Sequence, residues 1–186
     1  MPGPVVEEGE RVTLRAVERD DAAFLQRSNT DPRVRFPLGS FVHGNRAERR
    51  DQIAEDTEAD GTRGFVVCLD DEDAPRDHPE GATTPIGDVH VRGLDGDRAW
   101  LSYWLLPDHQ GEGYAGEAVA LAVDLAFRES AVHGVSAGAY AYNEASRGLL
   151  ESLGFTEDVF EREVGFVDGA YRDACAYSLL RREWES

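Results

Sequence analysis

Residues 109–116 constrain this chain most, because they place three glycines between an apolar strand-like run and a helical pattern. The loop reads His-Gln-Gly-Glu-Gly-Tyr-Ala-Gly, and the apolar run before it covers residues 99–106. A glycine turn between a strand and a helix leaves backbone N–H groups free at the positive end of the helix dipole. Glycine also lets an anion approach the backbone without a Cβ in the way. The loop predicts a phosphate site; an ordinary glycine-rich connection is the alternative.

The loop differs from two well-known phosphate motifs. The nucleotide-hydrolase loop requires a lysine after its last glycine, and no lysine follows this loop. Its glycine spacing also fits the dinucleotide fingerprint poorly. The loop alone therefore indicates an anion without identifying it.

The net charge of the chain limits the classes of partner that it is expected to bind. The 19 basic residues are all arginine, and with 37 acidic residues they give a formal net charge of −18. Such a field repels nucleic acid and anionic membranes, so neither is expected as a partner. An acidic, lysine-free composition is typical of halophilic proteins; a GC-rich codon supply is the alternative explanation. The length of 186 residues predicts one domain, residues 1–186.

The cysteines and the N-terminal residues indicate a reduced, cytoplasmic protein. Cys68 and Cys175 lie far apart in apolar stretches, so buried thiols are expected rather than a disulfide. No signal peptide, membrane-spanning run or metal-binding spacing of histidines and cysteines is found in the sequence, so no metal is expected.

The spacing of apolar residues along the rest of the chain predicts one α/β domain without repeats. Asp31-Pro32 and the prolines and glycines after it predict an irregular segment over residues 31–45, lying over a groove. A charged loop over residues 70–84 is expected to be solvated. The expected strands are 11–17, 64–69, 85–94, 98–106, 135–140, 155–167 and 171–180, and the expected helices are 20–29, 46–60, 115–126 and one that Asn143 caps and Gly154 ends.

Three stretches together resemble the GNAT superfamily of acyl-CoA-dependent N-acetyltransferases. They are residues 103–118 around the glycine loop, residues 143–155, and the hairpin over residues 166–173. The chain resembles most the ribosomal-protein N-terminal acetyltransferase (RimJ/RimL-like) branch. The resemblance implies an α/β (α+β) fold with a central mixed, largely antiparallel sheet of about seven strands, splayed in a V and flanked by about four helices.

The resemblance also implies that acetyl-CoA is the co-substrate. In that family the glycine loop holds the CoA pyrophosphate, and the pantetheine arm lies in the V, here against main-chain groups of Leu105 and Leu106. The other residues implied for CoA binding are Gln110, Gly111, Glu112, Gly113, Tyr114, Ala115, Gly116, Asn143 and Arg147, the last as an added cation. Amide dipoles at short range outweigh the distant carboxylates of an acidic chain, because salt screens charges beyond roughly 10 Å at 0.1 M.

Transfer of an acyl group to an amine needs a group that protonates the departing thiolate. Many family members place a tyrosine for this role where this chain has Leu150. The resembling branch instead places a serine where Ser146 stands, so Ser146 is the expected general acid. A plain polar residue at a helix start is the alternative for Ser146.

The transfer also needs a base for the ammonium proton. The glutamate of the branch falls on Gly165 in this chain. Glu163, two residues earlier, is expected on the same strand face and would act through a water. Asp88 and His90 are further candidates; each is also typical of an ordinary solvated strand residue.

The resemblance implies an enzyme that moves an acetyl group to a primary amine by direct attack in a ternary complex. A protein N-terminal α-amine is the first candidate acceptor. A small-molecule amine (amino acid, polyamine or aminoglycoside) is the second, and a non-catalytic acyl-CoA-binding module is the alternative of another class. The chain is expected to act as a monomer or homodimer.

Overall fold

The structure is a computed structural model that describes residues 2–39, 45–79 and 81–184. The strands are β1 (Val5–Glu8), β2 (Thr13–Ala16), β3 (Arg63–Asp70), β4 (Thr83–Arg92), β5 (Arg98–Leu105), β6 (Gly134–Tyr140), β7 (Thr156–Val167) and β8 (Ala170–Leu180). The helices are α1 (Ala22–Leu25), α2 (Arg27–Thr30), α3 (Pro32–Leu38), α4 (Arg46–Glu58), α5 (Tyr114–Glu129), α6 (Glu144–Ser152) and α7 (Arg181–Trp184), with 3₁₀ turns at Arg19–Asp21 and Pro107–His109.

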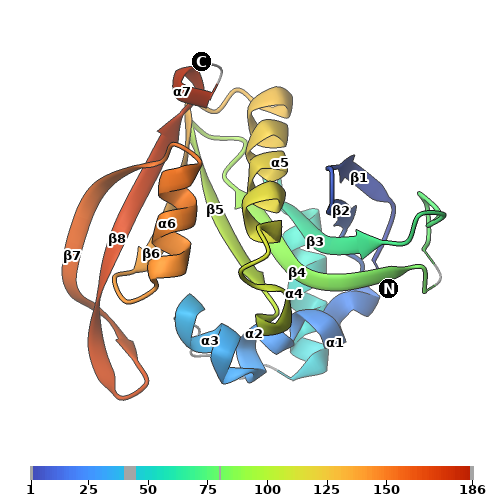
Figure 1. Ribbon diagram of the computed structural model, residues 1–186, viewed down its shortest axis with the longest axis horizontal. Helices are drawn as coiled ribbons and strands as arrows, with labels where there is room; N and C mark the ends of the chain where they lie inside the picture. The colour runs from blue at the N-terminus through green and yellow to red at the C-terminus, as the bar shows by residue number, and fades with distance from the viewer. Residues whose placement is uncertain (1, 40–44, 80, 185–186) are drawn as a thin grey trace.

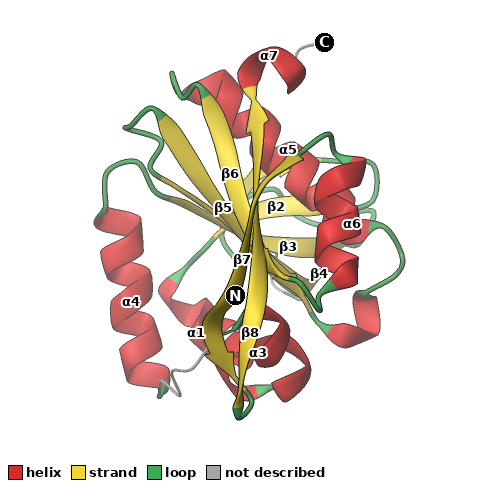
Figure 2. Ribbon diagram, turned by 90° about the vertical axis from the view of Figure 1, so that its left-hand side faces the viewer, coloured by secondary structure: helices red, strands yellow, loops and turns green. Residues whose placement is uncertain are grey.

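The strands form one sheet in the order β1-β2-β3-β4-β5-β6-β8-β7 (Figure 1). Only β5 and β6 run parallel; the other neighbouring pairs are antiparallel. Figure 2 shows α5 and α6 on one side of the sheet and α4 on the other. The sheet thus has covered faces, as a layered α/β domain requires.

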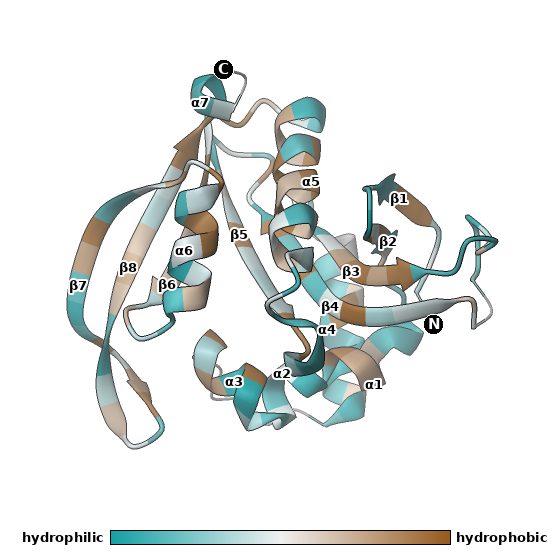
Figure 3. Cartoon of the chain, viewed as in Figure 1, coloured by the Kyte–Doolittle hydropathy of each residue, from teal (hydrophilic) through white to brown (hydrophobic). Residues whose placement is uncertain are grey.

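The main core lies between the sheet and α5. Ala118, Ala122 and Val119 are fully buried, and their small side chains let the helix approach the strands closely. A second, smaller cluster on the other face joins Ala22, Leu25, Val34, Ile53 and Trp104. In Figure 3 brown, apolar segments alternate with teal, hydrophilic ones along α5, as expected for a helix with one buried face.

Strands β5 and β6 separate partway along their length. They pair only from Arg98 to Leu101 and from Gly134 to Ala137. Beyond these residues the edges of both strands that face one another are unpaired, which is the V that the resemblance implies. The expected largely antiparallel sheet splayed in a V is therefore confirmed, with eight strands rather than about seven.

The expectation of an irregular segment over residues 31–45 is wrong for its first half. Asp31 caps α3 by accepting a hydrogen bond from the N–H of Arg33, and Pro32 occupies the first turn, where its missing N–H costs nothing. The Asp-Pro pair therefore starts a helix rather than only ending one. Residues 40–44 lie outside the described part of the chain. Strand β1, which the sequence did not predict, extends the sheet beyond β2.

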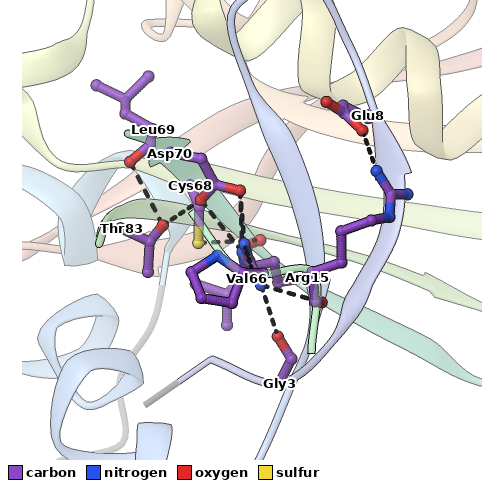
Figure 4. A network of polar contacts seen from close by, with 10 residues as sticks. Gly3, Glu8, Arg15, Val66, Cys68, Leu69, Asp70 and Thr83 are labelled. Atoms are coloured by element: carbon purple, nitrogen blue, oxygen red, sulfur yellow. Dashed lines mark hydrogen bonds and ion pairs between the residues drawn. The ribbon is translucent and has the colours of Figure 1, made fainter. Parts of the chain in front are cut away.

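A buried arginine fixes the N-terminal residues and the loop expected to be solvated (Figure 4). Arg15 is 0% exposed, and its guanidinium binds the Asp70 carboxylate at 2.7 Å. It also donates to the carbonyls of Gly3 and Pro75. A buried guanidinium needs these acceptors because an unpaired charge in the interior is costly. The network therefore holds β1, β2 and the start of the loop after β3 together.

Candidate active site

A cleft of about 810 Å³ opens where β5 and β6 separate. Its walls come from α3, β5, the glycine loop, β6, α6 and the β7–β8 hairpin. Among its described lining residues only Arg33, His109 and Glu161 have ionisable side chains that change or carry charge near neutral pH, apart from one cysteine. The cleft is therefore largely apolar despite the strong negative charge of the chain.

The glycine loop at one end of the cleft has the conformation that its sequence demands. Gly111 and Gly113 have φ values of 82° and 86°, in the left-handed region that favours glycine. Gln110 N–H bonds the Pro107 carbonyl and Glu117 N–H bonds the Gly113 carbonyl. Between them, the N–H groups from Gly111 to Gly116 form no hydrogen bond with any described residue. These free donors at the start of α5 fit a pyrophosphate.

Arg11 braces this loop from behind. Its guanidinium donates to the Glu112 carbonyl at 2.8 Å and to the Glu117 carboxylate at 3.1 Å, and it lies over the Tyr114 ring. Burial raises the pKa of Glu117, but the hydrogen bonds from Arg11 and Val12 outweigh it, and the net pKa lies below the ordinary value. Glu117 thus stays ionised and anchors the loop, a role that the sequence did not assign to Arg11.

The end of β5 is fixed by its own neighbours. The Gln110 side chain donates to the Leu105 carbonyl at 3.0 Å, and the Leu106 N–H donates to the Ile86 carbonyl at 2.7 Å. Two of the main-chain groups that the resemblance offers to pantetheine are thus engaged within the protein. Leu105 itself lines the cleft.

Ser146 faces the cleft from the first turn of α6. The Asn143 side chain caps this helix by accepting the Ser146 N–H at 3.2 Å, which fixes the position of the serine. The Ser146 hydroxyl lies 2.8 Å from the hydroxyl of Tyr103 on β5. Burial raises the pKa of Tyr103 to about 12, against the opposing effect of its bond with Ser146. The tyrosine therefore stays a neutral donor.

The sequence reasoning missed Tyr103. The only signal for it was the two-residue alternation of β5, which places Tyr103 on the same face as Leu101 and Leu105. That alternation does not indicate which helix side chain it meets, because the contact joins residues 43 positions apart.

The Arg147 side chain binds other residues of the protein and does not line the cleft, so it does not take the expected role of a cation for the CoA phosphates. Its guanidinium donates to the Tyr177 hydroxyl at 3.1 Å and to the Glu157 carboxylate at 3.4 Å. Arg147 is not among the described residues that line the cleft. The helix places it one position beyond Ser146 and thus on another face.

Strand β7 contains a bulge that changes the expected position of Glu163. Glu161 pairs with Ala174 and Gly165 pairs with Arg172, so four steps on β7 match two steps on β8. Glu163 lies in this bulge with a φ of 54°, and its N–H donates to the Asp173 carboxylate. The period-two expectation fails here, because Glu161 and Val164 line the cleft and Glu163 does not.

Asp88 and His90 form a buried pair on the α4 side of the sheet. The His90 Nε2 atom lies 3.1 Å from the Asp88 carboxylate, and neither residue lines the cleft. Burial lowers the pKa of His90, but the Asp88 carboxylate outweighs it and raises the net pKa above the ordinary value. The pair is thus an internal ion pair at acidic pH rather than a base that reaches the cleft.

No group of three or more His, Cys, Asp or Glu side chains in the described chain could hold a metal ion. None of the helices in the described ranges is long and apolar enough to cross a membrane.

Comparison with known proteins agrees with this geometry. A family model described as the acetyltransferase (GNAT) domain matches residues 11–156. A putative ribosomal N-acetyltransferase of Bacillus subtilis, YdaF, is 34% identical over 101 residues, which are 53% of this chain and 55% of that protein. This aligned region therefore spans about half of YdaF.

Longer but weaker similarity extends over nearly the whole chain. The spermidine N(1)-acetyltransferase of Vibrio cholerae is 25% identical over 176 residues, which cover 94% of this chain and 95% of that protein. A crystal structure of spermidine N-acetyltransferase from Vibrio cholerae, in complex with CoA and spermine, superposes with a TM-score of 0.82 at 22% identity. It covers 95% of this chain and 99% of that one, so the two share a fold.

Proposed function

The chain belongs to the acetyltransferase (GNAT) domain family, and from this premise we propose that its acceptor is the α-amine of a protein or peptide N-terminus. Family membership makes the chain an acetyl-CoA-dependent N-acetyltransferase that acts on an amine. The similarity to YdaF supports the peptide acceptor. A polyamine is the second candidate, because the relatives that align over nearly the whole chain include spermidine acetyltransferases.

The row of free N–H groups from Gly111 to Gly116, beside the opening of the V, carries the functional assignment. The amides and the α5 dipole fit the pyrophosphate of acetyl-CoA. The unpaired edges of β5 and β6 offer main-chain groups to an extended arm that enters the V. Asn143 contributes by holding the first turn of α6 beside this opening.

Ser146 is the proposed general acid, with Tyr103 behind it. When the thioester carbon is attacked, the bond to sulfur breaks and the electron pair leaves on the thiolate. The Ser146 hydroxyl can give this thiolate a proton while the Tyr103 hydroxyl, 2.8 Å away, donates to the serine oxygen. Two linked hydroxyls stabilise the departing charge better than one, because each polarises the next.

The proposed acceptor of the ammonium proton is Glu161, which replaces Glu163 in this role. Glu161 faces the cleft and makes no ion pair or hydrogen bond with any described residue. A carboxylate there can take the proton directly or through one water before the neutral amine attacks.

The composition supports a proposal about the setting of the enzyme. Cys68 and Cys175 are free and buried, which fits a reducing compartment such as the cytoplasm. The net charge of −18 fits a halophilic protein that works at high salt.

Thiol release from acetyl-CoA in molar KCl, with a panel of peptides and amines, tests the function. We expect turnover with peptides that carry a free α-amine and none with the same peptides blocked by N-terminal acetylation. Binding of acetyl-CoA without turnover on any amine would instead establish a non-catalytic acyl-CoA-binding module.

A further inference from the structure

The acceptor end of the cleft has an aromatic residue where the sequence lacks a carboxylate. Gly165 is not among the glycines with positive φ, so its backbone conformation does not require glycine. A Cβ at Gly165 would instead lie 2.4 Å from the Tyr140 hydroxyl oxygen and 2.8 Å from the Tyr140 Cε1 atom. The glycine is needed because the Tyr140 side chain occupies the space that a side chain at position 165 would fill.

The Tyr140 ring is held in place from several directions. A Cβ at Gly39, after α3, would lie 2.2 Å from the Tyr140 Cε2 atom, so the ring also fills the space beside α3. On another side it stacks on Tyr142 with ring centroids 5.3 Å apart, and the Tyr142 hydroxyl donates to the Phe36 carbonyl. The Tyr140 hydroxyl makes no hydrogen bond with any described residue. A rigid aromatic ring with a free hydroxyl therefore closes this end of the cleft.

Tyr140 and Glu161 lie in one row across three strands. Tyr140 pairs with Ala174 on β8, and Ala174 pairs with Glu161 on β7. Paired residues share a face, and neighbouring strands are about 4.8 Å apart, so the backbones of Tyr140 and Glu161 lie about 10 Å apart. The Tyr140 ring itself reaches across β8 towards Gly165 on β7. Tyr140, Ala174 and Glu161 all line the cleft, so the ring and the carboxylate border the same space, with the small Ala174 side chain between their backbones.

The floor beside this row is also small and apolar, with a second aromatic residue next to it. Gly138 and Ala176 pair with one another and continue the same face one step along the strands. The Trp100 ring lies over Gly138, since a Cβ there would be 3.3 Å from the Trp100 Cζ2 atom. Trp100 is 49% exposed and lines the cleft, so its ring is open to a bound molecule.

The charges of the lining limit the charge of the acceptor. Glu161 is the only acidic side chain among the described residues that line the cleft. Arg33, the only arginine there, is engaged with the Asp31 carboxylate at 2.9 Å. A polyamine brings several ammonium groups, and each one beyond the first would lose its hydration against apolar walls without a carboxylate.

We propose that this site accepts a primary amine that carries one positive charge on an apolar body, with Glu161 as the counter-charge and Tyr140 and Trp100 as the walls. The inference rests on the proposed function and makes its acceptor more specific. An aromatic face stabilises an ammonium, and the Tyr140 hydroxyl supplies a polar contact at the end of the site. An N-terminal α-amine followed by apolar residues and a free arylalkylamine share this chemistry.

The first test compares acceptors at saturating acetyl-CoA in molar KCl. The panel is phenethylamine, a short peptide with an apolar N-terminal residue and no other charge near it, and spermidine. We expect kcat/KM for one or both of the singly charged amines to exceed that for spermidine by about tenfold or more. Preference for the peptide or for phenethylamine identifies the source of the amine. Equal or better use of spermidine would overturn the inference.

Calorimetric titration of the same amines into the CoA-loaded protein separates this inference from the proposed function. If no amine is turned over, the proposed function fails, while tighter binding of phenethylamine than of spermidine still supports the site. Tighter binding of spermidine would contradict it in either case.

Variants test the walls and the charge. Trp100→Ala and Tyr140→Ala are expected to raise the KM for phenethylamine about tenfold and to leave the KM for acetyl-CoA within about twofold. Tyr171→Ala is the matched control, because this tyrosine is 66% exposed at the far end of the hairpin. Ala174→Asp adds a second carboxylate and is expected to shift the ratio of kcat/KM towards spermidine by about tenfold. An unchanged ratio in Ala174→Asp, with an intact fold, would show that charge in this row does not select the acceptor.

Discussion

The hydroxyls of Tyr103 and Ser146 lie 2.8 Å apart and connect β5 to α6 beside the point where β5 leaves β6. Tyr103 lies on β5, one arm of the V, and Ser146 lies on α6, which follows the other arm, β6; the Asn143 side chain fixes the serine by capping α6. The bond therefore places a donor pair where the arm of acetyl-CoA is expected to pass. The contributions of the two hydroxyls can be measured separately, because Ser146→Ala and Tyr103→Phe each remove one hydroxyl without changing the backbone.

Ser146→Ala is expected to lower kcat by about 10- to 100-fold and to leave the affinity for acetyl-CoA almost unchanged, because the lost proton donor acts mainly in the transition state. Tyr103→Phe is expected to lower kcat less, since the serine remains. Steady-state thiol release and calorimetry with acetyl-CoA measure the two quantities. Wild-type turnover in Ser146→Ala would show that Ser146 only begins the helix.

Gly113→Val is expected to weaken acetyl-CoA binding tenfold or more, about 1.4 kcal/mol. Gly113 has a φ of 86°, and a Cβ there would lie 3.0 Å from an Arg11 guanidinium nitrogen, so valine strains the loop and displaces its brace. Gly96→Val is the control, because its Cβ meets no atom closer than 3.5 Å. The dissociation constants are measured by calorimetry, on variants whose circular dichroism spectrum matches that of the wild type. An unchanged dissociation constant in Gly113→Val would contradict the assignment of the loop to acetyl-CoA binding.

The sequence predicted the parts of the site that depend on local conformation. The loop glycines, the Asn143 cap and the end of α6 at Gly154 follow from positive φ and capping chemistry, which neighbouring residues encode. The V required the family resemblance, because the separation of β5 from β6 is a property of pairing between distant strands.

The parts that the sequence could not predict depend on register and on long-range contacts. The two extra residues in β7 exchange Glu163 for Glu161 in the cleft, and nothing in the local sequence marks a bulge at that place. The position of Arg147 next to Ser146 predicts a phosphate cation, but its partners lie on the two following strands: Glu157 on β7, 10 residues further along, and Tyr177 on β8, 30 residues further along. The sequence does not predict α3, because Asp31-Pro32 indicates a helix end, whereas in the structure Pro32 occupies the first turn of α3.

The melting temperature is expected to rise markedly between low salt and molar KCl. With 37 acidic and 19 basic residues, the folded chain repels itself when counterions are scarce, and salt screens this repulsion. Calorimetric scans at KCl concentrations from about 0.05 to 2 M measure this change in melting temperature. A flat or falling profile would argue for codon bias rather than adaptation to salt.

The Arg15–Asp70 pair is expected to make unfolding depend on acidity. Burial raises the pKa of Asp70, but the hydrogen bonds from Arg15 and Thr83 outweigh it and hold the net pKa below the ordinary value of 3.8. The unfolded carboxyl therefore binds its proton first, so this stabilisation is complete above the ordinary pKa and is lost as the pH falls through the lower folded pKa.

Asp70→Asn is expected to remove this acid dependence and to lower the free energy of unfolding by about 3 kcal/mol, since it leaves a buried arginine without its counter-charge. Urea titrations between about pH 3 and pH 7 measure both effects. Asp158→Asn, on an exposed position of β7, is the control. A parallel pH dependence in Asp70→Asn and the wild type would show that the pair does not control acid stability.

The effect of Gly165→Ala on the free energy of unfolding is expected to change sign when Tyr140 is replaced by alanine. In the wild type the new methyl group meets the Tyr140 hydroxyl at 2.4 Å, and the ring cannot easily move because Gly39 and Tyr142 enclose it, so the variant is destabilised by about 1 kcal/mol. In a Tyr140→Ala background the space is open and the backbone at position 165 is ordinary, so the same change stabilises by about 0.5 kcal/mol through the unfolded state. Urea unfolding of the four proteins gives the coupling between the two positions, about 1.5 kcal/mol, as a double-mutant cycle. The same sign and size of effect in both backgrounds would mean that Tyr140 does not occupy the space beside Gly165, and the acceptor site would then lose its closed end.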